Sequence, residues 1–480
     1  MNAIETIKSG NVENIKKLFV RAVDPKTQEK AINEFNVEKH DVFDSEKRPV
    51  KLITKDSGTV DGDGNPILIK NFPVEVNRVG SSLQSLIVER RVGFALTNPV
   101  TIKTVVEKES KKTKSLVAMV EKIQDDNKMD YKNKEILRRT LSELECAVIW
   151  YFVETGEPKP KFTLKAKILS PELGDTLFPL FDATGSMISF ARAYKLEESG
   201  NKIDHFDVYT DEAEYRYINR DNSWTLDEIT NETGAAIPNP IPNAVQKMMI
   251  EYHMIKKPIW NNVQSKIDRK ETLDSNHSDM NDYFGSPMMA VSGEIEGFAA
   301  KGEQGKIIQL AQGAEAKYLA LSSPPESIKM EIENLKEDIY TESQTPNISF
   351  SEMKGLGNIA EVTMKSFFMD AHMAVGTIEE WFGLGLQRRL NIIKNAIGKL
   401  IDTSLAAEAK SVTLKPVITP YMPTNTTELI DNISVSVTGG VMSAQTGREQ
   451  NPLVTNKEQE ETRIADQKGL ESAGVDDLNK

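Results

Sequence analysis

The chain has 480 residues and a single cysteine, Cys146, which excludes an internal disulfide framework and a thiolate zinc cluster. Its length is typical of about three domains, and 59 basic against 72 acidic residues give a formal net charge of −13, which disfavours wrapping duplex DNA through phosphate neutralisation. No apolar run approaches the roughly 18 residues of a membrane span, and the N-terminus lacks the apolar core of a signal peptide. We therefore expect a protein assembled in the cytoplasm, without a membrane partner.

The N-terminal half is rich in strand patterns. Apolar residues flank the turn sequence Asp-Gly-Asp-Gly-Asn-Pro at 61–66 and predict a β-hairpin. The same acidic spacing resembles a calcium loop, but Pro66 stands where that loop needs glycine and Phe72 where it needs glutamate, so we favour the turn. The apolar periodicity of 81–96 then predicts a helix that stops before the Asn-Pro pair at 98–99.

A charged amphipathic stretch at 103–145 predicts helices. Its basic cluster at 111–114 could contact phosphate, but a solvated helix face explains it better. Strand patterns return at 148–168 as a second hairpin and continue through about residue 224. The proline-rich segment 237–242 predicts a boundary.

Two helical segments, 258–284 and 323–341, flank a glycine-rich segment that carries short strand candidates. The first segment has a polar middle, as helices that border solvent-filled space often have. The second begins with a capping box at 323–326, with proline at the first helical position, and its narrow apolar seam is typical of a helix packed in a ring or bundle. The residues that we expect to pack the two helices are Trp260, Val263, Ile267, Met280, Phe284, Ile328, Ile332, Leu335 and Ile339.

A mostly polar loop at 342–358 separates this pair from a long helical stretch at 359–405. Its apolar seam consists of Leu386, Leu390, Ile393, Ile397 and Leu400. Three glycines inside the stretch predict a bend, namely Gly376, Gly383 and Gly385. A strand at 412–418 follows, and short helices are expected to be capped near Thr424, Ser443 and Thr455.

The search for catalytic motifs is negative. The Gly-Lys pairs at 305–306 and 398–399 are followed by isoleucine and leucine, so there is no phosphate-binding Walker loop. The Gly-x-Gly-x-x-Ala sequence at 355–360 follows a polar loop instead of a strand, which disfavours a dinucleotide site. The five histidines, at 40, 205, 253, 277 and 372, lack metal-ligand spacing. We therefore expect no enzymatic activity, no cofactor and no metal.

The order of the segments resembles that of the portal proteins of tailed bacteriophages, of the siphophage type. The resemblance rests on ordered segments over most of the chain and not on one diagnostic motif. In the N-terminal part, 38–41 and Arg48-Pro49 are similar to the family's opening pattern, and 86–94 leads into a Thr-Asn-Pro-Val turn whose Thr97 replaces the usual glycine. Further along, the similar segments are 275–293, 335–340, 345–358 and 412–463.

The resemblance implies an α+β portal-type subunit made of successive parts. These are an α/β wing (1–257), a first stem helix (258–284), a small α/β clip (285–322), a second stem helix (323–341), a tunnel loop (342–358), a long kinked helix (359–405), and an α-helical crown with the C-terminal tail (406–480).

The resemblance also implies a function in the virion. Twelve copies would form a ring at one capsid vertex, through which double-stranded DNA is packaged and ejected. The implied partners are terminase, a head–tail adaptor, the major capsid protein and scaffold, with assembly in the host cytoplasm. Twelve copies, each at −13, would carry −156, a charge that lets a duplex slide without tight phosphate contacts.

In this interpretation the tunnel loop faces the DNA. Lys354 would be an isolated cation near phosphates, and Glu352 would repel them; the alternative is an ordinary exposed loop. A virion component without a channel and an enzyme of unrecognised type are the competing functions. The residues expected along the channel are Asn347, Ser349, Phe350, Ser351, Glu352, Met353, Lys354 and Asn358.

Overall fold

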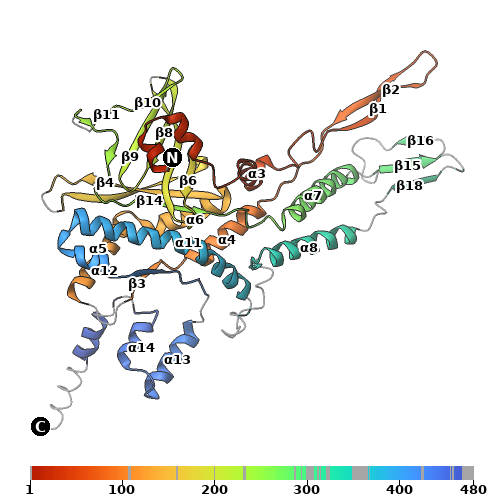
Figure 1. Ribbon diagram of the computed structural model, residues 1–480. Coiled ribbons are helices and arrows are strands. Elements are labelled where there is room, and N and C mark those ends of the chain that lie inside the picture. The colour runs from red at the N-terminus through yellow and green to blue at the C-terminus, as the bar shows by residue number, and fades with distance from the viewer. Residues whose placement is uncertain are drawn as a thin grey trace, which may run out of the picture. The chain divides into compact units, whose positions relative to one another are not determined.

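Figure 1 shows a computed structural model of the chain. It describes residues 3–105, 110–157, 160–198, 200–230, 234–285, 288–292, 295–298, 308–310, 313, 315–319, 325–348, 366, 368–422, 426–454, 456 and 459–467. Internal contacts divide the chain into a first unit, Met1–Thr345 with Ala374–Pro420, and a second unit, Pro346–Met373 with Tyr421–Lys480.

The fold class is α+β, as the sequence predicts. Every strand pair in the described part of the chain is antiparallel, and helices do not alternate with strands as they would in a parallel α/β sheet. Among the described residues, no helix is both long enough and apolar enough to cross a membrane.

The largest sheet of the first unit has the strand order β10-β9-β8-β7-β6, and β13 (Ile241–Pro242) pairs with β9. Two short helices, α1 (Ala3–Lys8) and α2 (Val12–Leu18), pack Ile7 and Ile15 against aromatic and small residues of this sheet. The strand patterns predicted up to about residue 224 are confirmed as β6 (Thr176–Phe181), β7 (Met187–Glu198), β8 (Asn201–Tyr209), β9 (Ala213–Arg220) and β10 (Ser223–Leu226).

A second sheet has the order β14-β4-β5. The predicted hairpin is confirmed, since β4 (Glu145–Glu154) pairs with β5 (Phe162–Leu169). The boundary predicted at the proline-rich segment is wrong: β13 lies in this segment and pairs with β9, and β14 (Ile250–Met254) then pairs with β4. Prolines there interrupt regular structure without ending the unit. A small sheet of β11 (Ile229–Thr230) and β12 (Ala236–Ile237) precedes β13 in the chain.

Helices of the first unit pack against the second sheet and against one another (Figure 1). The helix predicted at 81–96 is α4 (Leu83–Leu96), and the charged stretch after it contains two helices preceded by a short strand. That strand, β3 (Thr101–Thr104), pairs with β19 (Leu414–Val417) from far along the chain. The other helices are α3 (Pro25–Phe35), capped by Asp24, α5 (Lys111–Asp126), capped by Ser110, and α6 (Met129–Glu143).

The predicted long helix is α-helical over most of its described length and ends in a π-helical segment. In the described residues α11 (Met369–Ala396) continues through all three of its glycines, and α-helical bonding gives way to a π-helical segment at Ile397–Ile401. A 3₁₀ turn (Thr403–Leu405) and α12 (Ala406–Ser411) follow. The three glycines therefore lie within the regular α-helical part, and a π segment, in which the usual hydrogen bonding is relaxed, lies at the end of the helix.

The predicted N-terminal hairpin is formed by β1 (Lys51–Val60) and β2 (Pro66–Val74). At its turn, the side chain of Asp61 accepts hydrogen bonds from the backbone N–H groups of Asp63 and Asn65, and Gly64 adopts a positive φ of 85°. The acidic spacing thus serves a turn, as we favoured, because asparagine, aspartate and glycine tolerate this geometry.

Between the two predicted stem helices, the described residues form four short strands. β15 (Met288–Ser292) pairs with β18 (Glu315–Leu319), and β16 (Ile295–Phe298) pairs with β17 (Ile308–Leu310). They lie between α7 (Gln264–Gly285) and α8 (Pro325–Glu342) in the chain.

The second unit contains α13 (Thr426–Thr438) and α14 (Ala444–Gln450). The predicted cap at Ser443 is confirmed, because its side chain accepts a hydrogen bond from the backbone N–H of Thr446, whereas Thr424 and Thr455 lie outside the described residues. Contacts assign 406–420, which the sequence places in the crown, to the first unit.

Candidate functional site: the anchored helix pair

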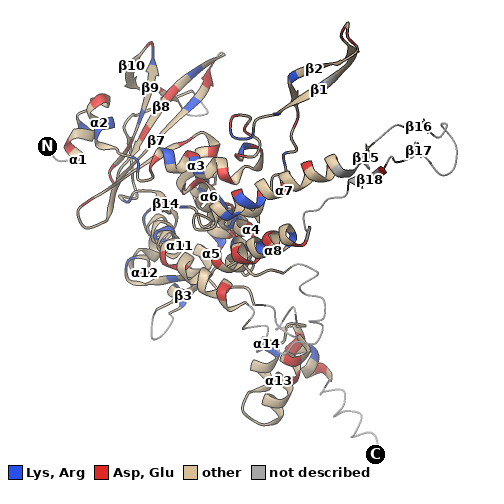
Figure 2. Cartoon of the chain, turned by 90° about the vertical axis from the view of Figure 1, so that its right-hand side faces the viewer, with Lys and Arg blue, Asp and Glu red and all other residues tan. Residues whose placement is uncertain are grey.

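The helices α7 and α8 form an antiparallel pair. Lys266, near the start of α7, lies 2.8 Å from the Asp338 carboxylate and 2.5 Å from that of Glu342, near the end of α8. One turn later in α7, Arg269 pairs at 2.9 Å with Glu331, which lies two to three turns earlier in α8 than Asp338 and Glu342. Figure 2 shows the charged residues along both helices. Because these ion pairs are exposed, each contributes at most about 1 kcal/mol to the free energy of folding. They fix the antiparallel orientation of α7 and α8 more than they stabilise the pair.

One face of α7 carries a polar ladder, which we define as Glu271, Ser275 and Asp279. Their spacing of four residues places them about 6 Å apart along one helix face. They accept hydrogen bonds from the backbone N–H groups of Ser81, Val79 and Asn77, at 2.7, 2.9 and 2.7 Å. Alternate residues of an extended segment are separated by nearly the same distance, roughly 6.6 Å, so the two repeats match.

This ladder explains one face of the polar middle of α7. Polar residues there were expected to border solvent-filled space, but Glu271 and Ser275 are only 1% and 0% exposed. They are buried because the extended segment 77–81 lies against them and its backbone N–H groups need acceptors. The polar face is thus an attachment surface within the subunit.

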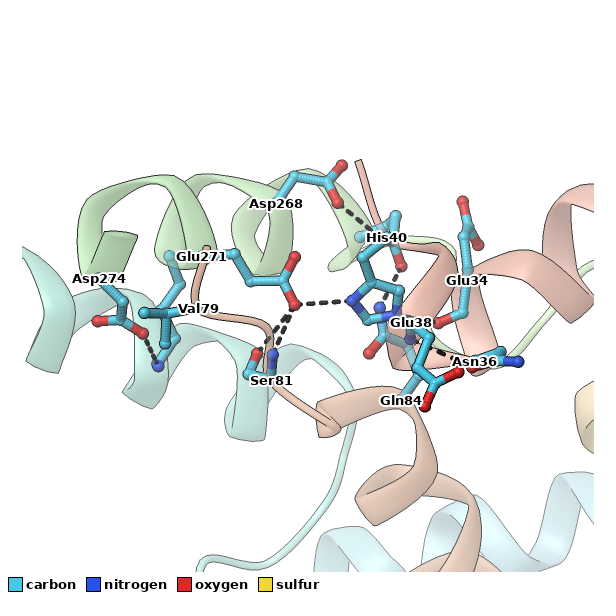
Figure 3. Close-up of polar contacts among 12 residues, drawn as sticks. Glu34, Asn36, Glu38, His40, Val79, Ser81, Gln84, Asp268, Glu271 and Asp274 are labelled. Carbon is cyan, nitrogen blue, oxygen red and sulfur yellow. Dashed lines mark hydrogen bonds and ion pairs between the residues drawn. The ribbon is translucent and has the colours of Figure 1, made fainter. Parts of the chain in front are cut away.

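His40 forms a buried ion pair with the first rung of the ladder (Figure 3). Its Nδ1 lies 2.7 Å from Glu271 Oε1, and its Nε2 lies 2.7 Å from the backbone carbonyl oxygen of Glu34. Both neighbours are acceptors, so both ring nitrogens donate and the imidazole is held as the cation. Burial alone would lower the pKa of His40, but the hydrogen bond and charge of Glu271 outweigh it and raise that pKa.

The last rung of the ladder holds the base of the hairpin β1–β2. Asp279 accepts hydrogen bonds from Arg48 at 3.0 Å and from Lys51 at 2.9 Å, besides the one from the backbone of Asn77. Burial would raise the pKa of Asp279, but the Asn77 N–H and the two cations lower it. The Asn77 side chain also donates to Asp282. The residues before and after the hairpin are therefore fixed to the same helix face.

The residues predicted to pack the helix pair divide into two groups. At the base, Trp260 stacks on Phe35 with ring centroids 6.0 Å apart, and its Nε1 donates to Glu34 Oε2 at 2.8 Å. The fully buried group is Trp260, Val263, Ile267 and Ile339, and the half-buried group is Met280, Ile328, Ile332 and Leu335. The side chain of Phe284 lies outside the described residues.

Of the residues predicted along the channel, the structure describes Asn347. It is partly buried, and its Oδ1 atom has no hydrogen-bond partner among the described residues. The others lie outside the described residues, namely Ser349, Phe350, Ser351, Glu352, Met353, Lys354 and Asn358.

The long helix α11 is fixed to strand β14 by a buried ionic network. Arg389 donates two hydrogen bonds of 2.8 Å to the Glu251 carboxylate, and His253 Nε2 lies 2.7 Å from the same carboxylate. Burial would raise the pKa of Glu251, but the Arg389 charge and the His253 hydrogen bond lower it to about 2. A Cβ at Gly385 would lie 2.1 Å from His253 Cε1, so this glycine allows the helix to approach.

Within the part of the chain that the structure describes, no three His, Cys, Asp or Glu residues lie together as a metal site. Burial raises the pKa of the Cys146 thiol well above its usual value, so this thiol is not an activated nucleophile. The polar groups described above hold helices in place.

Comparison with known protein families identifies the family of this chain. Residues 39–472 match the model of the family described as "Phage portal protein, SPP1 Gp6-like". The chain belongs to this family of phage portal proteins. Its members are structural components of the virion, so a portal or connector role follows for this chain. No curated protein matches the chain.

Solved structures match the chain with low sequence identity and TM-scores below 0.5. The neck of a native gene transfer agent (GTA) particle, computed with C12 symmetry, matches at 10% identity and a TM-score of 0.44, covering 94% of this chain and 98% of the other. The neck of an empty GTA particle, computed with C6 symmetry, matches at 10% identity and a TM-score of 0.40, and the virion of the native particle at 11% and 0.38. Each of these two covers 76% of this chain and 87% of the other.

The portal motif at 38–41 and Arg48-Pro49 now has a physical explanation. His40 and Arg48 bind the first and last rungs of the α7 ladder, more than 200 residues away in sequence. Sequence reasoning established only that His40 lacks metal-ligand spacing, and it did not identify Glu271, Ser275 or Asp279. The available signal was their four-residue spacing in a helix that has few apolar residues in its middle.

Proposed function

We propose that copies of this portal protein close into a ring, twelve as the family resemblance implies, whose central channel carries double-stranded DNA during packaging and ejection. The ring would stand at one capsid vertex of the virion. Family membership over residues 39–472 supports a portal role, and the geometry of α7 and α8 supports the ring.

The single observation that carries the ring is the unequal burial of the helix pair. At its base, Trp260 and Ile339 are 0% and 1% exposed. Further along α8, Ile328, Ile332 and Leu335 stay half-buried in a single copy. Covering apolar surface of this kind is favourable by about 25 cal/mol per Å². A neighbouring copy against this seam would complete the packing that one subunit begins.

Charge supports a passive channel. The chain carries a net charge of −13, and α8 has six acidic residues against two lysines. An acidic wall disfavours tight phosphate contacts and allows a duplex to slide, whereas a basic wall would hold it. Because the sequence lacks a Walker loop, the energy for packaging would come from a separate terminase. A head–tail adaptor, the major capsid protein and scaffold are the other partners that we propose.

The proposal is tested by assembling particles with and without this chain. If the chain forms the channel, particles lacking it contain no packaged DNA, and labelled chain is found at a single vertex, where the tail attaches. Full packaging without the chain, or labels spread over the shell, would instead favour a virion component without a channel role.

A further inference from the structure

The hairpin β1–β2 exposes apolar side chains on both of its faces. Leu52 is 62% exposed and Leu68 is 54% exposed. Because successive strand residues point to opposite faces, the apolar run 67–69 contributes to both. Within the described chain, each strand pairs only with the other. A two-stranded hairpin has little stability of its own in water, and its open edges invite pairing with another chain.

The base of this hairpin is nevertheless fixed. Lys51 at its start, and Asn77 just after its end, both bind Asp279 of α7, and Arg48 adds a third hydrogen bond to the same carboxylate. An arm that is held at its base loses less conformational freedom when it binds a partner. The hairpin is therefore a preorganised arm whose apolar surface is uncovered in the single copy.

The charges of the hairpin are segregated along its length. The lower half, 51–55 paired with 69–74, contains three lysines and no acidic residue. Asp56 lies opposite Leu68 at its upper boundary, and the tip contains Asp61 and Asp63. Figure 2 shows the acidic tip in red. The lower half therefore fits a surface that offers both carboxylates and an exposed apolar side chain. The three lysines are Lys51, Lys55 and Lys70.

Such a surface lies on α8. We define its outer stripe as Glu326, Met330, Glu333 and Glu337, whose spacing of four, three and four residues places them on one helix face. All four are exposed, and Met330 is 60% exposed. The stripe is distinct from the α8 residues that pair with α7. It combines three carboxylates with one apolar side chain.

We propose that the lower half of the hairpin of one copy lies across the outer stripe of α8 in the next copy of the ring. This inference rests on the proposed ring. Apolar hairpin residues, with Leu68 at the boundary of the lower half, cover Met330, and Lys70 faces Glu333. Because two different surfaces of one chain meet, the contact is heterologous and can repeat around a closed ring.

Crosslinking tests the contact directly. The chain suits this because its one cysteine, Cys146, is 0% exposed. In the variant Leu68→Cys with Met330→Cys, a short bis-maleimide crosslinker should join neighbouring copies into a ladder of covalent multimers on a denaturing gel. The matched control is Leu226→Cys with Met330→Cys, in which Leu226 is 43% exposed on β10, and it should give no ladder.

The outcomes separate this inference from the proposed ring. If the purified variant forms rings in the microscope but gives no multimers beyond the control, the hairpin contact is wrong and the ring stands. Crosslinks confined to monomers would overturn the contact in the same way. If the unmodified chain forms no rings, both proposals fail.

A charge exchange provides a second readout. Lys70→Glu should raise the protein concentration at which half of the copies are in rings by about three- to fivefold, the range of an exposed ion pair. Adding Glu333→Lys to the same chain should restore it, whereas Glu333→Lys alone should weaken assembly. Additive effects of the two substitutions would overturn the pairing.

Discussion

The buried imidazole of His40 lies 2.7 Å from the Glu271 carboxylate and joins the first part of the chain to the helix α7. The side chains of the two residues are only 3% and 2% exposed. A pair buried so deeply is costly to break, because either partner left alone is an uncompensated charge. The attachment of α7 to the N-terminal part of the chain therefore depends on an ion pair that closes a loop of more than 200 residues.

The first prediction concerns the pH dependence of this pair. The pKa of His40 is raised above its ordinary value of 6.5 in the folded protein. Its protonation therefore stabilises the fold fully below about pH 6.5, and this contribution is lost as the pH rises through the raised pKa. We expect His40→Gln to lower the melting temperature most at pH 5.5–6, with a smaller difference at higher pH.

The control for that experiment is Lys39→Gln, an exposed neighbour of His40. It should leave the melting temperature unchanged to within a degree or two across the same range. A difference between wild type and His40→Gln that grows with increasing pH would contradict the imidazolium assignment.

The second prediction concerns the middle rung of the α7 ladder. Ser275→Ala removes the acceptor of the Val79 N–H and leaves it buried without a partner, which costs about 1–3 kcal/mol. Hydrogen exchange should show faster exchange of the Val79 amide. Ser265→Ala, at an exposed position of the same helix, is the matched control. Equal exchange in the two variants would show that Ser275 does not hold the segment.

The third prediction compares two glycines of α11. Gly385→Ala places a methyl group 2.1 Å from the His253 ring, and overpacking of this kind costs about 1–3 kcal/mol. Gly383→Ala meets no atom within 4 Å and should stabilise the helix by roughly 0.5–1 kcal/mol, because alanine is the better helix former. Urea unfolding of both variants measures the difference. Equal effects would contradict the close approach at Gly385.

The fourth prediction concerns the buried pair of α11 and β14. Arg389→Met removes the main charge partner of the buried Glu251 carboxylate and leaves it only the hydrogen bond to His253, which should cost about 3–5 kcal/mol. Loss of the Arg389 charge should also raise the pKa of Glu251 from its value of about 2, so the variant should lose least stability in acid. A loss of stability that does not depend on pH would indicate that the Arg389 side chain matters for packing alone.

The fifth prediction concerns the loop that we expect to face DNA. Shortening 349–356 should impair packaging and leave ring assembly intact, because a loop that contacts DNA in the channel has no part in closing the ring. DNA content per particle and microscopy of the purified variant are the two measurements. Normal packaging by the shortened chain would show that this loop is not used.

Much of the fold can be predicted from local patterns in the sequence. The hairpin at 61–66, the strands up to about residue 224 and the helix at 81–96 follow from turn residues and apolar spacing, which are properties of neighbouring residues. The same patterns do not show what the glycines of the long helix do. A glycine in a helix can mark flexibility or a close approach, and only the position of His253 shows that Gly385 serves the second purpose.

The site was less accessible to sequence reasoning for a physical reason. The rungs of the ladder bind Asn77, Val79 and Ser81 through backbone N–H groups, which every non-proline residue has, so the partners carry no distinctive side-chain signature. His40 and Glu271 are separated by 231 residues, and no local spacing relates them. The seam of α8 was visible in the sequence, because its apolar residues repeat along one face.

Class averages of the purified chain in negative stain are the sharpest test of the proposed ring. We predict closed rings with a central hole wide enough for a DNA duplex. Monomers, open filaments or compact particles without a hole, at concentrations at which portal rings would assemble, would contradict it.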